Sequence, residues 1–512
     1  MTRSIAKTAE WRRIDALPRL MWPDVDMTPY LRRPGGTMRL WRTQSVALYY
    51  AAVLGGLVGA IGVGEGKSVM SLLFPVAMAA HRPLLLVPAA LRDQTLRKVI
   101  PEMRKHWILH PHLRIMSYSK LSRSGVDLGS PDVIIADEAH ELANFKAARG
   151  RRLYEYLRAN PDTRVVLLSG TLTKKSLLEF YRLSELALKE MSPLPREYQE
   201  AATWDLALSP KRDNHYFERV LPGALTQWHP DPREAFRRRL AETPGFVVSQ
   251  KSECAASIHI RLHRVSMPKI QDVVEQCEAL WETPDERELW NGLTVFACAE
   301  QLSQGFFYRL LEPPPREWLE KRRSYQRAVA QYLRYHRSIH SEYEYRMHVD
   351  SPEKDAWLAV QRDYDLAKEA VWFSDEVIQW AMAQEGPAII WTAHTAFGDR
   401  MAQEMPHYGA GQGRIIYERG DRTISASIAA HGTGKNLQMY SRIVVPVMHG
   451  GDWEQLIGRC HRAGQLADTV TVDVLLHTSV TKRAWQTALA RAHYQAEIMS
   501  DRRLLAATIT EV

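Results

Sequence analysis

Short apolar runs alternate with helical stretches over the first 190 residues of the chain. Leu84–Val87, Asp132–Ala136 and Arg164–Leu168 are apolar at nearly every position, which is typical of strands buried on both faces. Before Leu84, the stretch Val69–Ala80 is apolar almost all round and is predicted to be a buried helix. Strands that alternate with helices indicate a parallel, doubly wound α/β sheet.

The pattern changes after residue 190 and returns near residue 386. In between, strand signals are few, prolines interrupt the chain, and long helical stretches carry many aromatic residues. We expect a leader at 1–37 packed on a first α/β lobe at 38–190, a mainly helical insertion at 191–385, a second lobe at 386–480 and a C-terminal helix at 481–512. Strands of the second lobe are expected at Ala388–Thr392, Arg414–Tyr417, Ile424–Ala429, Arg442–Val447 and Thr469–Leu476.

One apolar segment, Val46–Gly64, has the length of a membrane helix and no charge. Its four glycines between Gly55 and Gly62 and its continuation into a phosphate-binding pattern predict instead a helix from about Gln44 to Val53, a turn and a buried strand. The start of the chain, Met1–Asp15, is polar and charged, so we expect no secretory signal and no membrane association. Four widely spaced cysteines without a CxxC motif predict neither a zinc site nor a disulfide framework, which fits a cytoplasm, bacterial or phage-infected.

The net charge of +8 favours a polyanionic partner. From Arg316 to Arg346, eight basic residues face four acids and are interleaved with aromatic side chains. Such a stretch suits a nucleic-acid groove, where cations follow phosphates and rings stack on bases. A solvated amphipathic helix has much the same composition, and both interpretations stay open.

The strongest motif is IGVGEGKS, at Ile61–Ser68. Its glycines Gly62, Gly64 and Gly66 allow backbone N–H groups to close around phosphates, while Lys67 reaches the β and γ oxygens and Ser68 offers a hydroxyl to Mg²⁺. The strict pattern has glycine where this chain has Ile61, a departure that leaves the phosphate cradle intact.

A second motif, PDVIIADEAHELAN, places acids at the end of a predicted strand. Ligands of open α/β sheets lie beyond the carboxyl ends of the strands. We therefore predict that Asp137 holds the Mg²⁺ of a nucleotide and that Glu138 orients and deprotonates the attacking water. An acidic helix turn after a strand has a similar composition when such a pair stands alone.

Two further signals are weaker when taken singly. The amide of Gln44, just before the P-loop domain, has the donor and the acceptor needed to read adenine. Arg459 and Arg462 are three residues apart, so on a helix they would share a face, and they are candidate arginine fingers for a γ-phosphate. A pair of helix arginines is otherwise a common surface ion-pair partner.

In combination, these motifs resemble those of superfamily 2 helicase motors of the DEAH-box type, most closely the Swi/Snf-type DNA translocases and their phage-encoded relatives. The ending HRAGQ, His461 to Gln465, resembles the Swi/Snf group in particular. The match covers about 1–190 and 385–480, and Met405–Ala430 is shorter than the corresponding passage of the family. The matching segments are, in order, MRLWRTQ, IGVGEGKS, LLLVPAALRDQ, IADEAH, LLSGT, AIIWTAHT, HGTGKNLQ and QLIGRCHRAGQ.

The resemblance implies two RecA-like P-loop lobes that use ATP and Mg²⁺, and it assigns further roles. Residues that couple hydrolysis to movement would be His140, Ser169, Thr171 and Gln455. Residues that contact nucleic acid would be Pro88, Arg92, Thr392, His394, Gly432, Thr433, Asn436 and Gln438.

The expected function is that of an ATP-dependent motor that moves along double-stranded DNA without sequence preference. A strand-separating helicase for replication or recombination is one alternative, although the insertion offers no recognisable wedge. An ATP-gated module that binds or remodels a protein is another. A restriction-system motor is a third, without a visible nuclease motif.

Overall fold

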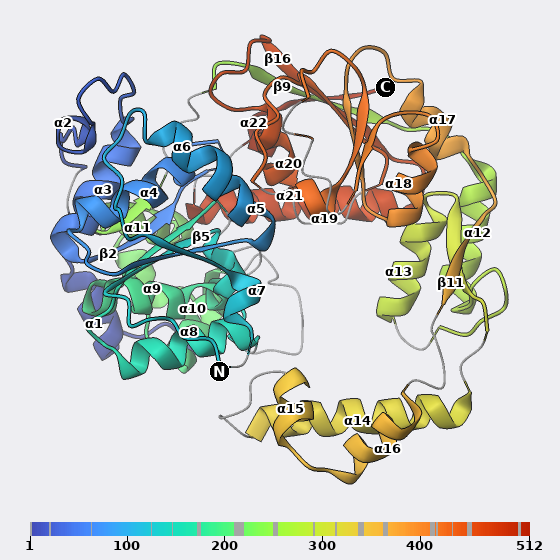
Figure 1. Ribbon diagram of the computed structural model, residues 1–512, viewed down its shortest axis with the longest axis horizontal. Helices are drawn as coiled ribbons and strands as arrows, with labels where there is room; N and C mark the ends of the chain where they lie inside the picture. The colour runs from blue at the N-terminus through green and yellow to red at the C-terminus, as the bar shows by residue number, and fades with distance from the viewer. Residues whose placement is uncertain are drawn as a thin grey trace. The chain divides into compact units, whose positions relative to one another are not determined.

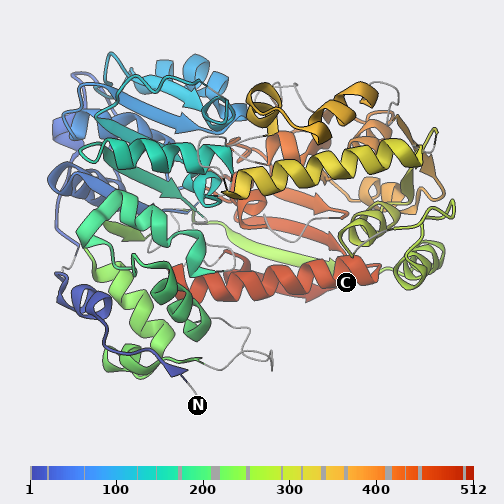
Figure 2. The same ribbon diagram turned by 90° about the horizontal axis from the view of Figure 1, so that it is seen from below.

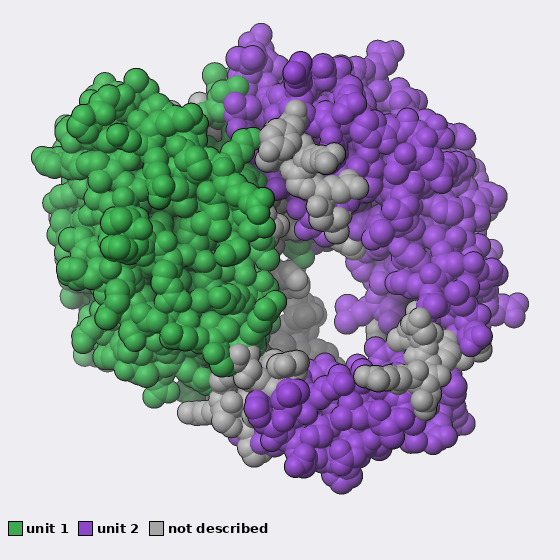
Figure 3. Space-filling view, viewed as in Figure 1, with its two compact units in different colours: residues 1–255, 453–464, 489–506 green, residues 256–452, 465–488, 507–512 purple. Residues whose placement is uncertain are grey.

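The structure is a computed structural model in which the chain forms two compact units (Figure 3). Unit 1 comprises residues 1–255, 453–464 and 489–506, and unit 2 comprises residues 256–452, 465–488 and 507–512. The structure describes residues 3–19, 22–62, 64–123, 125–145, 147–170, 176–208, 220–248, 254–289, 292–312, 315–335, 342–361, 367–409, 415, 418–432, 434–447, 453–499 and 503–512.

Unit 1 is built on a parallel sheet of six strands, in the order β4-β3-β5-β6-β2-β8 (Figure 1). The strands expected from the apolar runs are all present. The bounds are β2 Gly56–Ala60, β3 Pro83–Val87, β4 Arg114–Ser117, β5 Val133–Asp137, β6 Arg164–Ser169 and β8 Phe246–Val248.

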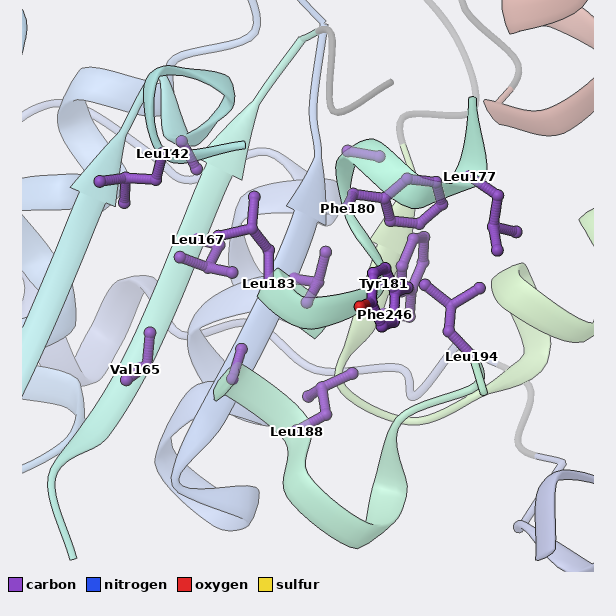
Figure 4. Packing of buried hydrophobic residues seen from close by; sticks show 14 of the residues in the cluster. Leu142, Val165, Leu167, Leu177, Phe180, Tyr181, Leu183, Leu188, Leu194 and Phe246 are labelled. Atoms are coloured by element: carbon purple, nitrogen blue, oxygen red, sulfur yellow. The ribbon is translucent and has the colours of Figure 1, made fainter. Parts of the chain in front are cut away.

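Both faces of this sheet are buried, because neighbouring residues of each strand enter different cores. On β6, Val165 and Leu167 join one hydrophobic cluster, while Val166 and Leu168 join another. Figure 4 shows part of the first cluster, where side chains of β6 and of α9 (Tyr181–Leu188) pack together. The doubly wound arrangement predicted from the sequence is thereby confirmed.

The helices of unit 1 connect and cover these strands. The apolar segment at 46–64 forms the end of α3, a turn at Gly55 and strand β2, as expected. Within the described ranges, every helix is too short or too polar to cross a bilayer. The main helices are α3 Arg42–Leu54, α4 Lys67–Ala77, α5 Ala89–Gln94, α7 Tyr118–Leu121, α8 Ala148–Ala159, α9, α10 Tyr198–Leu208 and α11 Pro232–Glu242.

The leader contains a helix that the sequence pattern did not predict, α1 (Ala9–Ala16). Its Trp11 stacks on Trp228 with ring centroids 5.7 Å apart. The buried guanidinium of Arg239, on α11, donates from Nε to the carbonyl oxygen of Ile14 at 3.0 Å. These contacts fix the leader on residues of the segment predicted as the insertion, and its predicted packing on the lobe at 38–190 stays a prediction.

Unit 2 contains a parallel sheet of seven strands, in the order β13-β14-β12-β15-β16-β9-β17. The chain thus has two parallel sheets with helices, which confirms the predicted fold class of two α/β lobes. The strand bounds are β9 Ser257–His263, β12 Ile389–Thr392, β13 His407–Tyr408, β14 Ile424–Ser427, β15 Arg442–Val445, β16 Thr469–Leu475 and β17 Thr508–Glu511.

Asp473 of β16 lies at the centre of this second sheet and is completely buried. Its Oδ1 atom accepts from Arg261 Nε at 2.7 Å and lies 2.7 Å from His263 Nε2, both on β9. Its Oδ2 atom accepts from Arg442 Nε of β15 at 2.8 Å. One carboxylate therefore ties three adjacent strands together.

Two details of the second lobe differ from the sequence-based expectation. The C-terminal helix was expected to run to residue 512, but Thr508–Glu511 form β17 beside β9. Two threonines and an isoleucine favour an extended backbone there, and β9 offers them an open edge. The strand expected at Ile424–Ala429 ends at Ser427, where α19 (Ile428–His431) begins. Most of Arg414–Tyr417 lies outside the described residues.

The insertion at 191–385 is mainly helical where it is described, but it also supplies β8 and β9 to the two sheets. The predicted domain boundaries at 190 and 386 stay predictions. Within unit 2, β10 (Phe306–Leu310) and β11 (Lys368–Trp372) form an antiparallel ribbon. Three helices lie between these strands in sequence (Figure 1): α14 Arg316–Tyr335, α15 Glu342–His348 and α16 Pro352–Val360.

These helices have a small aromatic core of their own, contributed by α14, the long yellow helix of Figure 2, together with α15 and α16. Trp318, Tyr325, Tyr345 and Trp357 are buried in it, so these rings are not available to stack on bases. Among the described aromatics of the basic stretch, Tyr335 is the exposed exception, at 70%. The alternation of cations and rings therefore reflects an amphipathic helix with an aromatic buried face.

Candidate active site

The carboxyl edge of the unit 1 sheet brings the predicted catalytic segments together. Strands β5, β6 and β2 are parallel neighbours in the sheet, so the residues that follow them meet at one edge. Strand β2 leads into the glycine-rich loop and α4, β5 ends at Asp137, and β6 ends at Ser169.

The glycine-rich loop turns through left-handed backbone conformations. Gly64 has φ of 89° and Gly66 has φ of 75°, a region that suits glycine. A Cβ atom on Gly66 would lie 2.1 Å from the Nε2 atom of Gln44, so a side chain here would have to displace the Gln44 amide. The loop can therefore run closely past the start of α4.

Lys67, the first residue of α4, is buried beneath this loop. Its Nζ atom donates to the carbonyl oxygen of Ile61 at 3.0 Å and to that of Gly62 at 3.3 Å. The same ammonium lies 3.8 Å from Glu138 Oε1. Ser68 follows at the second position of the helix and is exposed. A helix N-terminus with a lysine and a hydroxyl beside it is suited to bind phosphate.

Asp137 and Glu138 are both buried, and their electrostatic environments differ. Burial and the negative charge of Glu138 raise the pKa of Asp137 to about 7. Burial would also raise the pKa of Glu138, but the charge of Lys67 and the hydrogen bond with His140 outweigh it and hold that pKa below its ordinary value. At neutral pH the pair thus contains one firmly ionised carboxylate and one that exchanges a proton easily.

The backbone of Glu138 is unusual and positions the next residues. It has φ of 58°, which is uncommon for a residue with a side chain, and it precedes a short 3-10 helix at Ala139–Leu142. In this arrangement His140 Nδ1 lies 3.5 Å from Glu138 Oε2 and 3.1 Å from Ser169 Oγ. His140 therefore links the end of β5 to the end of β6. Thr171, predicted for the same coupling role, lies outside the described residues.

Gln44 is buried between α3 and the glycine-rich loop. Its Oε1 atom accepts from the N–H of Trp41 at 3.0 Å, and its Nε2 atom donates to the carbonyl oxygen of Glu65 at 3.3 Å. The amide thus holds the loop, and one hydrogen and one lone pair are left for an adenine edge. Its role in reading adenine stays a prediction.

Arg459 lies on α20 (Trp453–Cys460), which belongs to unit 1 although it is distant in sequence from the P-loop. It is buried, and its charge lowers the pKa of both Asp137 and Glu138. Gln455, one turn earlier on the helix, is also buried. The structure places Arg459 near Asp137 and Glu138, and its role as an arginine finger for a γ-phosphate stays a prediction.

The expectation that Arg459 and Arg462 share a helix face is wrong. Helix α20 ends at Cys460, and Arg462 lies in the following turn, which leads to Gly464 with φ of 88°. A glycine in the left-handed region ends a helix readily, so the three-residue spacing is not helical here. Arg462 is half-buried, and its role stays a prediction.

The predicted nucleic-acid contacts of unit 1 follow strand β3. Pro88 is the N-cap of α5, and Arg92 on that helix is partly exposed and pairs with Asp93 at 3.2 Å. These residues lie at the same carboxyl edge as the P-loop, on the other side of β5 from β6 and β2.

In unit 2, the predicted contacts follow the parallel neighbours β12 and β14. Thr392 is the buried last residue of β12, and His394 is the N-cap of α18 (Thr395–Met401). Gly432 is the C-cap of α19, after β14. Of the remaining three, Asn436 is exposed, Gln438 is half-buried, and Thr433 lies outside the described residues.

One contact at the site was not predicted from the sequence. Tyr118 is buried after β4, and its hydroxyl donates to the backbone carbonyl oxygen of Asp137 at 2.7 Å. Burial and the nearby acids raise the pKa of this hydroxyl well above its ordinary value, so it stays a donor. A tyrosine directly after an apolar strand was the available signal, but nothing in the sequence linked it to Asp137.

Comparison with known proteins gives limited information. No protein-family model matches the chain, and no curated protein matches it in sequence. Among solved structures, it is similar to a variant of S. cerevisiae Dbp5 bound to RNA and ADP BeF3, with a TM-score of 0.42 and 11% sequence identity over 93% of this chain and 90% of that one. A likeness this weak carries no argument about function.

Proposed function

We propose that the protein is an ATPase that converts hydrolysis into movement along nucleic acid, with duplex DNA as its track. The observation that supports this most directly is the group of charges at the carboxyl edge of the unit 1 sheet. Lys67, Asp137 and Glu138 meet there, and the charge of Arg459 acts on both acids. Phosphoryl transfer depends on such positioned charges.

The residues present fit a nucleotide-bound Mg²⁺. The Oδ1 atom of Asp137 is buried and has no hydrogen-bond partner among the described residues. Burial of such a carboxylate oxygen costs free energy unless a cation or a hydrogen-bond donor contacts it. Asp137 and Ser68 would hold the ion, which when bound neutralises charge on the phosphate oxygens.

In this proposal Glu138 receives the proton of the attacking water while the bond from that water oxygen to the γ-phosphorus forms and the bond to the leaving oxygen breaks. The lowered pKa of Glu138 keeps it ionised and able to accept. Lys67 and Arg459 hold positive charge beside the transferring group, and His140 orients Glu138. His140 would also couple changes at the site to Ser169, with which it forms a hydrogen bond.

The track would contact the carboxyl edges of the two sheets, at Pro88 and Arg92 in unit 1 and at Thr392, His394 and Asn436 in unit 2. Contacts of this kind are made to phosphates, so binding should be independent of sequence and sensitive to salt. The preference for duplex DNA rests on the motif resemblance, and above all on the HRAGQ ending.

The deciding experiment measures the ATPase rate of the purified chain without nucleic acid, and with single-stranded DNA, duplex DNA or RNA. We expect the largest stimulation with duplex DNA. Lys67→Ala should abolish turnover, and Glu138→Gln should bind ATP without hydrolysing it, which would accumulate a nucleic-acid-bound state.

Each other outcome has a definite meaning. Stimulation by RNA alone would mean that the protein moves along RNA and not along duplex DNA. Stimulation by single-stranded DNA alone would favour a strand-separating helicase. A rate that no nucleic acid changes would overturn the motor and favour an ATP-gated protein module. Normal turnover by Lys67→Ala would show that this P-loop is not the ATPase site.

A further inference from the structure

A second pocket of unit 1 lies at the opposite edge of the six-stranded sheet from the P-loop. It opens where β3, β4 and β5 begin, and it has a volume of about 410 Å³. Its walls come from the residues just before β3, the start of β4 and the segment that leads into β5. A strand of five residues separates the two edges by roughly 15 Å, so this pocket is separate from the candidate active site.

The rim of the pocket carries two arginines, two histidines and no carboxylate. His81, Arg82, His112 and Arg114 line it. The nearest acid along the chain, Asp132, is not among the lining residues. Its Oδ2 and Oδ1 atoms accept from the backbone N–H groups of His81 and Arg82 at 2.8 and 2.7 Å. The charges of Arg82 and Arg114 are therefore not neutralised by an acid that lines the pocket.

The side chains of the rim differ in what they contact. Arg114 donates from Nη1 to the carbonyl oxygen of Leu128 at 2.9 Å, and it lies so close to Gly129 that a Cβ atom there would be 1.7 Å from Nη1. Arg114 is thus held in position by backbone. In contrast, the side chain of Arg82 and the ring nitrogens of His81 have no hydrogen-bond or ion-pair partner among the described residues.

The floor of the pocket is apolar. Pro83, Leu84, Leu128 and Pro131 are buried side chains that line it. Such a floor suits the body of an organic molecule, whereas the rim suits an anionic group. Arginine presents a planar fork of donors that matches phosphate, and histidine adds further donors.

We propose that this pocket binds a phosphate group carried on a small apolar or aromatic body. The phosphate would lie between Arg82 and Arg114, and the apolar part would rest on the prolines and leucines of the floor. Two sources share this chemistry: a free organic phosphate, or a phosphate of the nucleic-acid backbone with its sugar or base.

The test uses the full chain with Lys67→Ala, so that phosphate binding at the P-loop is removed, and phenyl phosphate as the probe. Binding is measured by calorimetry for this protein and for the additional changes Arg82→Ala and His112→Ala. Arg123→Ala is the matched control, because Arg123 is an exposed arginine of the same unit that does not line the pocket.

We expect one phenyl phosphate per chain, and about tenfold weaker binding after Arg82→Ala, since a charge-assisted hydrogen bond to phosphate is removed. Arg123→Ala should bind as tightly as its parent. Inorganic phosphate and phenol should each bind more weakly than phenyl phosphate, because each has only one half of the recognised chemistry. Equal affinity in all variants, or no binding by the parent, would overturn the proposal.

A second arm identifies the source of the phosphate. If the backbone of nucleic acid supplies it, Arg82→Ala should weaken binding of a labelled oligonucleotide, and the oligonucleotide should compete with phenyl phosphate. If a free organic phosphate supplies it, oligonucleotide affinity should be the same in Arg82→Ala and Arg123→Ala. Each outcome assigns a source to a pocket that the first arm has shown to bind phosphate.

Discussion

At the scale of single residues, two adjacent carboxylates of the candidate site are held in different states of protonation. Asp137 is buried beside a negative neighbour, whereas Glu138 has Lys67 and His140 close by. Ionisation of Asp137 costs free energy in the absence of a cation, whereas ionisation of Glu138 does not. The difference predicts how the stability of the protein alone depends on pH.

Asp137→Asn should stabilise the protein in the absence of ligands at pH 8. The pKa of Asp137 is raised to about 7 in the folded state, so the folded protein favours the protonated carboxyl group. The stability that the protonated group provides is fully present below the unfolded pKa and is lost as the pH rises through 7. The gain should be on the order of 4 kcal/mol at pH 8, since the pKa of Asp137 rises from 3.8 to about 7 and each pKa unit corresponds to about 1.4 kcal/mol. It should shrink as the pH falls towards 5.

Denaturant unfolding of both proteins from pH 5 to pH 8.5 measures this difference. The same variant should lose Mg²⁺-dependent nucleotide binding, which serves as the internal control for the assignment of Asp137. A difference in stability that does not change with pH would mean that Asp137 is already ionised throughout this range.

Arg459→Ala should retain nucleotide binding and lose turnover. If Arg459 stabilises charge on the transferring phosphate, kcat should fall by a factor on the order of 10³. Arg459→Lys should recover little, because an ammonium lacks the planar fork. Nucleotide affinity and kcat are measured separately with saturating duplex DNA.

Arg462→Ala is the informative comparison, because Arg462 lies outside α20 in the following turn. An equal loss in both variants would assign both arginines to the phosphate. A loss in Arg459→Ala alone would assign the role to the helix. Normal kcat in Arg459→Ala would overturn its role as an arginine finger.

At the scale of elements, sequence reasoning found the strands that carry a continuous apolar run. Strands β3, β5, β6, β12 and β15 were found this way, and so was the edge of the sheet where β5 ends in Asp137. Strand β9 was missed because its buried Ile258, Ile260 and Leu262 alternate with polar and charged residues in a segment where other strand signals are few. Its place in the sheet is fixed by β16, which is remote in sequence.

The candidate site was predictable to a similar extent. Lys67, Asp137 and Glu138 were found from their motifs, because local spacing determines their chemistry. The hydrogen bond from Tyr118 to the backbone of Asp137 could not be found, since it depends on β4 and β5 flanking β3 in the sheet. The end of α20 before Arg462 was missed because two arginines at helical spacing look the same in a helix and in a turn.

Helix α14 carries six basic residues and two acids, and its aromatic face is buried. If it binds nucleic acid, it does so through charge. Changing Lys321, Arg322 and Arg323 to glutamate should weaken duplex binding. It should also reduce the salt dependence of binding, by roughly one unit of slope for each phosphate that the helix no longer neutralises.

The measurement is duplex affinity by fluorescence anisotropy from 50 to 300 mM salt, with circular dichroism to verify the helix. Because Arg322 lies over the ring of Trp318 at 5.4 Å, the single change Arg322→Gln controls for altered packing. An unchanged slope in the triple variant would identify α14 as a solvated face.

At the scale of the whole molecule, the chain does not form its units in sequence order. Unit 1 takes α20 and the segment 489–506 from the last 60 residues of the chain. Within this unit, the N–H of Leu504 donates to Glu454 Oε1 of α20 at 2.8 Å, and both residues are buried. The helix that carries Arg459 is thus held by the C-terminal region.

A fragment of residues 1–255 should therefore lack ATPase activity, even though it contains the P-loop and both acids. It has no Arg459, and it exposes the surface that α20 covers. Turnover and thermal unfolding of the fragment are compared with those of full-length Arg459→Ala, which lacks the guanidinium but keeps the helix. A fragment that hydrolyses ATP at the rate of the intact chain would show that α20 is dispensable.

The position of β9 has a consequence for synthesis on the ribosome. Its two neighbours in the sheet are β16 and β17, and Thr469 of β16 lies 212 residues after its partner Ser257. At a synthesis rate of about 5–20 residues per second, β9 is without its neighbouring strands for roughly 10–40 s. During this time both of its edges are unpaired and can form hydrogen bonds with other nascent chains. Its Arg261 is then a solvated charge and its His263 a solvated polar ring, and both oppose such pairing. The same two side chains later meet Asp473 and become part of the folded sheet.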